Sequence, residues 1–233
     1  MDFIARAIWR SSVNRRPNCR LNFRPSPVRP IIMGTTQATQ EYLLQGSVLD
    51  DSVDILLRRL RGMSDVSEES IVKFRQHEMV YSMREPNNSG TVSIRVRRSL
   101  NDPSQPWTMC YLGLPELGDR NSLTTVRTCI EVNCSQNVCP FLSEMGFRVE
   151  YDFVAQGWKF RKNKLKATVC KIYRINNPPS LEQLSPMTKS HLVEVSVISS
   201  SSDERAAAEV NTFSEQLKPL LNLEKKDPRR QDM

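Results

Sequence analysis

Apolar and polar residues alternate along most of the chain after residue 41, which is the pattern of half-buried β-strands. The clearest case is 147–153, where Phe147, Val149, Tyr151 and Phe153 are separated by charged residues. Further strands are predicted at 42–48, 72–84, 91–98, 107–113, 126–132, 157–162, 165–175 and 193–197. We therefore expect about eight to ten short strands.

Two of these strands are predicted to form a hairpin around the turn Lys162-Asn163-Lys164. In the second strand of that pair, 165–175, the apolar residues stand at odd positions up to Val169 and at even positions from Cys170 onward. This change predicts a bulge, or a strand that changes faces.

Two short helices are predicted among the strands. Apolar residues recur from residue 53 at i, i+3, i+4 and i+7, with Asp50 or Asp51 as the expected N-cap and an end near Gly62. A second helix is predicted at 138–145, where one face carries Val138, Phe141, Leu142 and Met145. Asn137 is available as its N-cap, and Gly146 is suited to the C′ position.

A third helix is expected near the C-terminus, at 201–223. Ser201 and Glu204 fit a capping box, and Pro219 is expected to kink or stop the helix. Its apolar stripe consists of Ala206, Val210, Phe213 and Leu217.

Many strands with few helices predict a mainly β (α+β) protein, namely an antiparallel β-barrel or curled sheet that carries about three helices. The expected organisation is a disordered basic arm at 1–38, a barrel domain at 39–224 and a charged tail at 225–233. No internal repeat is evident. No apolar stretch approaches the roughly 18 residues of a membrane span.

Charge is concentrated in the arm. The 233 residues include 33 Lys+Arg and 26 Asp+Glu, a formal charge of +7. Residues 1–33 carry seven arginines and a single acid, Asp2, which leaves the other 200 residues with 26 basic and 25 acidic side chains. A nucleic-acid interpretation of the basic pI therefore applies to the arm alone.

Arginine and proline without a sustained period predict disorder in residues 1–38. A plain leader or tail is the favoured interpretation of this segment. A mitochondrial transit peptide, which is typically Arg-rich and acid-poor, is an alternative, as is a nucleic-acid-binding arm. Translation starting at Met33, just before the organised sequence, is a further alternative.

Metal and nucleophile motifs are weak. The six cysteines include no C-x-x-C, and Cys129, Cys134 and Cys139 recur every five residues without a nearby histidine. We expect them to be reduced thiols that pack as small apolar side chains. His77 and His191 sit in no triad-like or metal-like motif and are expected to be structural.

Catalytic carboxylates were sought because a barrel tunnel lined with glutamates can hold a metal ion. Glu150 and Asp152 alternate with apolar residues and are expected on the solvent face, and Glu194 stands alone between Val193 and Val195. Neither the glycine-rich phosphate-loop spacing nor the dinucleotide-binding spacing is present. No catalytic, metal or cofactor site is predicted.

Two small basic faces are expected on the strands. One consists of Arg95, Arg97 and Arg98, and the other consists of Arg161, Lys162, Lys164 and Lys166. Phosphate contacts would suit them. Solvated strand edges protected by charge are the favoured interpretation.

Eight segments, in order, also match a known family. They are EYLLQGSVLD (41–50), HEMVY (77–81), WTMCYLGLPELGD (107–119), FLSEMGF (141–147), FVAQGWKFRK (153–162), KIYRI (171–175), LVEVSV (192–197) and EQLKPLLNLEKKDPRR (215–230). In these segments the chain resembles subunit 18 of the Mediator complex, over about residues 41–230.

The resemblance implies a many-stranded antiparallel barrel that acts in the nucleus as a non-enzymatic coactivator subunit of the Mediator head module. It implies a barrel–barrel heterodimer with Mediator subunit 20, capture of the C-terminal helix of subunit 8, and contacts with other head subunits. It implies neither direct sequence-specific nucleic-acid binding nor membrane binding. The partner-binding residues stay unknown. An RNA triphosphatase-like phosphohydrolase with a barrel fold and a mitochondrially targeted protein are the alternatives.

Overall fold

The computed structural model describes residues 39–65, 71–84, 90–116, 123–177, 180–199 and 203–225. The expected arm at 1–38, Ser201 of the expected capping box and all but the first residue of the expected tail at 225–233 lie outside these ranges. Their organisation therefore stays a prediction. Among the described residues, no helix is long and apolar enough to cross a membrane.

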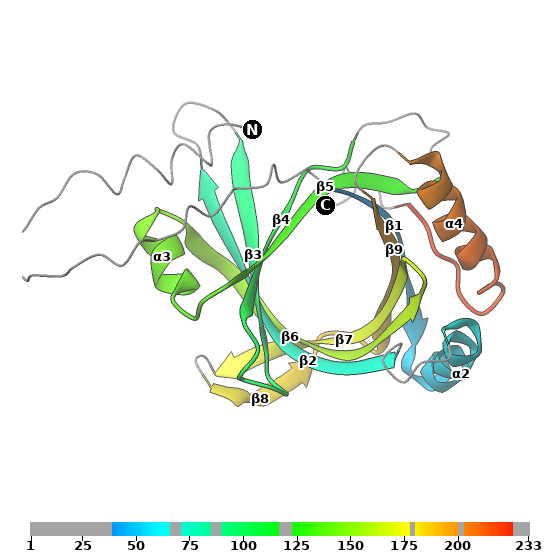
Figure 1. Ribbon diagram of the computed structural model, residues 1–233. Coiled ribbons are helices and arrows are strands. Elements are labelled where there is room, and N and C mark those ends of the chain that lie inside the picture. The colour runs from blue at the N-terminus through cyan, green and yellow to red at the C-terminus, as the bar shows by residue number, and fades with distance from the viewer. Residues whose placement is uncertain are drawn as a thin grey trace, which may run out of the picture. The chain divides into compact units, whose positions relative to one another are not determined.

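Nine strands in the described residues form one antiparallel sheet (Figure 1). They are β1 (Thr39–Leu49), β2 (Ile71–Arg84), β3 (Thr91–Ser99), β4 (Trp107–Leu112), β5 (Thr125–Cys134), β6 (Arg148–Lys162), β7 (Leu165–Asn177), β8 (Ser180–Pro186) and β9 (Ser190–Ser199). Their order is β6-β2-β3-β4-β5-β1-β9-β7-β8, and an additional β6–β7 pairing closes the first eight into a barrel. The predicted mainly β barrel is confirmed.

The outermost strand, β8, lies outside the ring and pairs with the C-terminal half of β7. No strand was predicted there, because residues 180–186 show no alternation of apolar and polar residues. The predicted hairpin is confirmed, since β6 and β7 are joined through Asn163 and Lys164. Asn163 has a φ of 54°, a left-handed conformation that asparagine tolerates better than most residues.

Within the described ranges, three α-helices lie outside the ring: α2 (Val53–Met63), α3 (Val138–Glu144) and α4 (Glu204–Glu215). Figure 1 shows α2 and α4 on one side of the barrel and α3 on another. A 3₁₀ turn, η1 (Asp50–Ser52), precedes α2, so Ser52 rather than Asp50 or Asp51 is its N-cap. Asp203 caps α4 by accepting a hydrogen bond from the Arg205 amide, whereas Ser201 of the predicted capping box lies outside the described residues.

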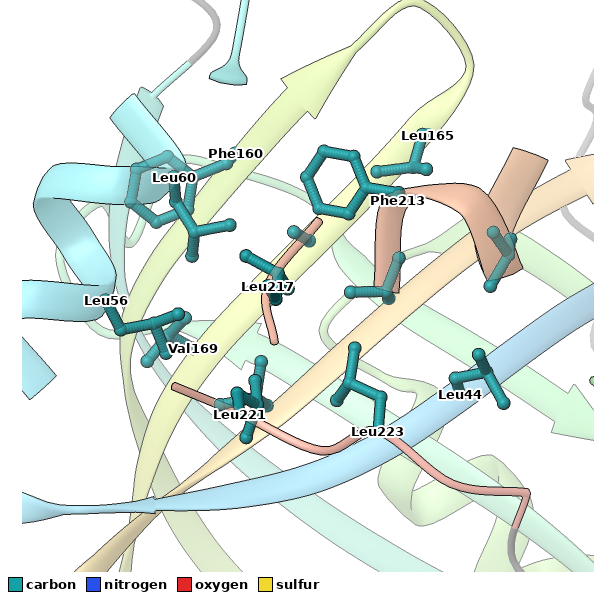
Figure 2. Packing of buried hydrophobic residues seen from close by; sticks show 14 of the residues in the cluster. Leu44, Leu56, Leu60, Phe160, Leu165, Val169, Phe213, Leu217, Leu221 and Leu223 are labelled. Atoms are coloured by element: carbon teal, nitrogen blue, oxygen red, sulfur yellow. The ribbon is translucent and has the colours of Figure 1, made fainter. Parts of the chain in front are cut away.

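The main apolar core lies between the barrel's outer wall and the helices α2 and α4 (Figure 2). It joins the outer faces of β1, β7 and β9 to the inner faces of the two helices. Burial of apolar surface on this scale is the dominant favourable term in folding. The apolar stripe predicted for the last helix is therefore part of the fold, since Phe213 and Leu217 are buried in this core.

A second, smaller core lies beneath α3. Val138 and Leu142 of the helix pack with Tyr81 of β2 and Val96 of β3. Gly146, the predicted C′ residue, ends this element with a φ of +95°, which glycine adopts without steric cost. The barrel thus has apolar cores on its outside.

The C-terminal segment returns to β1 after α4. The amide of Gln45 donates to the carbonyl of Glu224 at 3.1 Å, and the amide of Glu224 donates back at 2.9 Å. Gly46 leaves room for this crossing, because a Cβ there would lie 2.6 Å from the carbonyl oxygen of Asn222.

Two predictions about strand faces are wrong. β7 continues without a bulge through Val169 and Cys170 in its pairing with β6. Both faces of this strand are buried, so apolar residues can stand at odd and at even positions without a bulge.

The second wrong prediction concerns β6, where Val149 and Tyr151 are 53% and 50% exposed rather than buried. A register shift opposite Val80 and Tyr81 leaves Glu150 as an extra residue and resets which side the chain presents.

Candidate functional site: the charged barrel lumen and its surroundings

The inner face of the barrel is strongly polar and encloses a cavity of about 130 Å³. All eight ring strands contribute to its wall. Five cationic side chains line it: Arg95, Arg97, Arg127, Lys159 and Lys166. Four carboxylates face them: Glu41, Glu78, Glu131 and Glu194. The lumen is therefore a charged interior rather than an apolar core.

Register brings opposite charges together in the lumen. Glu78 of β2 lies beside β3, where its carboxylate accepts hydrogen bonds from Arg95 at 3.2 Å and Arg97 at 3.1 Å. Glu41 of β1 stands opposite Arg127 of β5, and their closest atoms are 2.7 Å apart. These carboxylates are committed to guanidinium partners.

Several polar residues were assigned to solvent and lie in the lumen instead. Arg95 and Arg97 were expected on a solvated edge, and Glu194 was expected to stand alone, yet all three line the cavity. Those expectations are wrong because the helices cover the apolar outer face, which turns the polar face inward. Arg98 does point outward, with its guanidinium 5.4 Å from the Trp107 ring centroid.

The second predicted basic face is divided by the structure. Lys166 faces the lumen, whereas Arg161 and Lys164 are exposed near the β6–β7 turn. Lys162 lies over the ring of Phe213, with its Nζ 5.8 Å from the centroid. The four residues do not form one surface.

Asp152, expected on the solvent face beside Glu150, is half-buried and pairs with His77. Its Oδ2 lies 2.9 Å from Nε2 of the histidine on the neighbouring strand β2. Burial lowers the pKa of His77 below its ordinary value of 6.5, and the hydrogen bond to Asp152 opposes this only in part. The pair joins β2 to β6, and the structural role expected for His77 stays a prediction.

A second histidine belongs to a polar cluster at the end of β1, in which Lys171 is buried and Asp50 is exposed. Lys171 is buried and donates to both carboxylate oxygens of Asp50. Nδ1 of His191 lies 3.0 Å from Oδ1 of the same carboxylate. The hydrogen bond from Lys171 holds the pKa of Asp50 below its usual range, while burial lowers the pKa of His191. This cluster joins η1 to β7 and β9.

We predict that the protein loses stability as the pH falls from 7 to 5.5. Both histidine pKa values are depressed in the fold, so the unfolded chain binds protons more readily below pH 6.5. The stability that the two neutral histidines contribute is fully present above pH 6.5 and is lost as the pH falls below that value. The chain has only two histidines. The thermal midpoint of a His77→Gln/His191→Gln variant should therefore fall less than that of the parent between pH 7 and 5.5. An equal dependence of the midpoint on pH in the two proteins would contradict the prediction.

The five cysteines that the structure describes do not gather into one site. Cys129 faces the lumen beside Cys110, while Cys134 and Cys139 pack against the second core under α3. Burial raises the pKa of the Cys170 thiol to about 12, so this side chain is an inert packing group. Among the described residues, no group of three or more His, Cys, Asp or Glu side chains is placed to hold a metal ion.

Exposed large apolar side chains occur around α3 and the start of β6. Phe141 is 44% exposed, and Val149 and Tyr151 are about half-exposed. The Tyr151 ring stacks on Phe153, with centroids 6.3 Å apart. Apolar surface that stays exposed in this way is suited to a protein partner.

Comparisons with known proteins agree on one family. A family model described as Med18 protein matches residues 40–233. "Mediator of RNA polymerase II transcription subunit 18" of Danio rerio is 44% identical over 206 residues, which cover 88% of this chain and 97% of the relative. The protein of the same name from Drosophila melanogaster is 41% identical, over 82% of this chain and 87% of the relative.

Solved structures show the same fold at low identity. A chain in "Structure of the Schizosaccharomyces pombe Mediator head module" superposes with a TM-score of 0.65 at 16% identity, covering 80% of this chain and 98% of that chain. The PH1819 protein of Pyrococcus horikoshii superposes with a TM-score of 0.53 at 17% identity, covering 80% and 94%. The barrel is thus shared beyond one family, whereas the sequence match from residue 40 onward is specific: this chain belongs to the Med18 family, that of Mediator of RNA polymerase II transcription subunit 18.

Proposed function

We propose that this chain is a non-enzymatic subunit of the Mediator head module and acts in the nucleus through protein–protein contacts. In that role it helps to link regulatory transcription factors to RNA polymerase II. The observation that carries the proposal is membership of the Med18 family along residues 40–233. The 44% identity to a Mediator subunit over nearly that subunit's whole length supports it.

The lumen chemistry fits an interaction subunit better than a phosphohydrolase. A metal-dependent phosphohydrolase needs several carboxylates free to ligate a divalent cation. Glu41 and Glu78 are instead bound by arginines at 2.7–3.2 Å, so their charge is already neutralised. Carboxylates paired in this way are not free to ligate a metal ion, and protein partners are proposed to bind the outer surface.

The proposed partners are Mediator subunit 20, as a second barrel, and the C-terminal helix of subunit 8. Barrel packing and helix capture both depend on buried apolar area. Phe141 of α3 and Val149 and Tyr151 of β6 supply exposed apolar area. We assign partner contact to this surface.

The test is co-purification of head subunits with the tagged full chain from nuclear extract. We expect other Mediator head subunits to co-purify, and a Val149→Asp/Tyr151→Asp variant to retain less than a tenth of at least one of them. A matched control is Ile55→Asp/Met187→Asp, because these side chains are exposed to a similar extent, 52% and 53%, on other elements.

Thermal midpoints of both variants should stay within a few degrees of the parent, since exposed substitutions usually change stability by less than about 0.5 kcal/mol. Equal partner loss in the two variants would contradict the assigned surface. Absence of every Mediator subunit from the parent sample would contradict the function itself.

A further inference from the structure

The lumen contains two cations without a carboxylate partner. Glu41 is paired with Arg127, Glu78 with both Arg95 and Arg97, Glu131 lies 4.0 Å from Arg97, and Glu194 accepts a hydrogen bond from Gln45. No carboxylate oxygen of the described residues lies within 4.0 Å of Nζ of Lys159 or Lys166. Nζ of Lys159 lies over the ring of Phe74, 4.4 Å from its centroid.

These two lysines and Arg97 face one another across a confined space. Burial lowers the pKa of Lys159, and the charges of Lys166 and Arg97 lower it further, while the more weakly acting charges of Glu131 and Glu78 raise it. Like charges in a partly desolvated interior repel more strongly than they do in water. A bound anion would offset this repulsion and would pair the two lysines, beside an Arg97 that already pairs with Glu78.

The space has the size and the access that a small anion needs. The lumen cavity of about 130 Å³ holds several water molecules, or one tetrahedral oxyanion with water. A second cavity of about 240 Å³ lies at the end of the barrel and shares Phe74, Gln76, Arg97, Glu131 and Lys159 with it. Its wall adds Lys73, Arg75 and Arg98 against a single further acid, Asp102. A basic entrance of this kind concentrates anions.

We propose that Arg97, Lys159 and Lys166 bind a small phosphate-class oxyanion inside the barrel, which enters from the end where β2 begins and β3 ends. The anion is held by charge-assisted hydrogen bonds and undergoes no covalent step. The site goes beyond the proposed function, because it gives the subunit a small ligand of its own in addition to its protein partners.

The test measures binding of inorganic phosphate to the full chain by calorimetry, at constant ionic strength with chloride as the exchanged anion. We expect saturable binding at one site and at least a tenfold loss of affinity in a Lys159→Met/Lys166→Met variant. The matched control is Lys164→Met/Lys189→Met, which removes the same charge from exposed positions. Its affinity should stay within twofold of the parent.

A nucleoside 5′-monophosphate is measured in parallel to identify the source of the phosphate group. Tighter binding of inorganic phosphate assigns the site to the free anion, and tighter binding of the nucleotide assigns it to the phosphate end of a larger molecule. Either result supports the site if the lumen variant weakens it selectively.

Stability without phosphate gives an independent readout. Removal of two mutually repelling cations should leave the thermal midpoint of the lumen variant equal to or above that of the parent. If the double variant fails to fold, Lys166→Met alone should still weaken phosphate binding about threefold or more. Absence of saturable binding, or equal weakening by the lumen and control variants, would overturn the proposal. Mediator co-purification is measured separately and depends on neither result.

Discussion

Replacement of Phe213 by alanine is expected to lower the free energy of unfolding by about 3–5 kcal/mol, the cost of deleting a buried aromatic side chain and leaving a cavity. Phe213 is only 4% exposed and projects from α4 into the main core. Figure 2 shows its ring close to Leu165 of β7 and above Leu217. A loss of this size is a large share of the stability of one domain.

Equilibrium urea denaturation of the isolated chain measures this effect. Thr212→Ala is the control, because Thr212 is the preceding residue on the same helix and is exposed. We expect a change of less than about 0.5 kcal/mol there. If Phe213→Ala costs less than about 1 kcal/mol, α4 is not held to the barrel by its apolar stripe, and the helix would instead belong to an interface.

Substitution of Gly157 is expected to be at least as severe. A Cβ on this residue would lie 1.9 Å from the carbonyl oxygen of Val169 and 2.7 Å from the Cα of Cys170. Both are backbone atoms of β7, so no side-chain rotation can relieve the clash. Gly157→Ala must therefore separate the β6–β7 pair that closes the ring, and we expect a loss of about 4 kcal/mol or more.

Gly62→Ala provides the control for that experiment. Gly62 lies in α2, and a Cβ there would have no heavy atom within 4 Å. Alanine should stabilise the helix by about 0.5–1 kcal/mol, because glycine costs more backbone entropy. Thermal and urea unfolding of the two variants should thus shift in opposite directions. A Gly157→Ala protein that unfolds like the parent would contradict the tight closure.

The elements could be predicted from the alternation, but the direction of each face could not. In β3, Ile94 and Val96 alternate with Arg95 and Arg97, which identifies a strand with one apolar face. An ordinary sheet would bury the apolar face inside and hydrate the polar one. Here helices cover the outer wall, so the apolar residues point out of the barrel and the arginines point in. Alternation reports that two faces differ and gives no information on which way the sheet curls.

The charge pairs of the lumen were missed for a related reason. Glu41 and Arg127 are 86 residues apart in the chain and become direct neighbours only through the β1–β5 register. Strand order is not encoded in local periodicity, so neither residue stood out. The extra residue at Glu150 had the same effect, because one bulge places Val149 and Tyr151 opposite consecutive residues of β2 and therefore on different faces of the sheet.

The return of the C-terminal segment to Gln45 has a consequence for synthesis on the ribosome. The strand β1 emerges early, yet its two neighbours in the ring are β5 and β9, and the core on its outer face is completed by α4 and Leu221–Glu224. A nascent chain therefore carries β1 with the edge that pairs with β9 still unpaired, and with its apolar face only partly covered, until nearly all described elements have been translated. Such a chain is prone to aggregation during this interval, and cotranslational chaperones that bind exposed apolar strands would be expected to occupy β1 until β9 and α4 replace them.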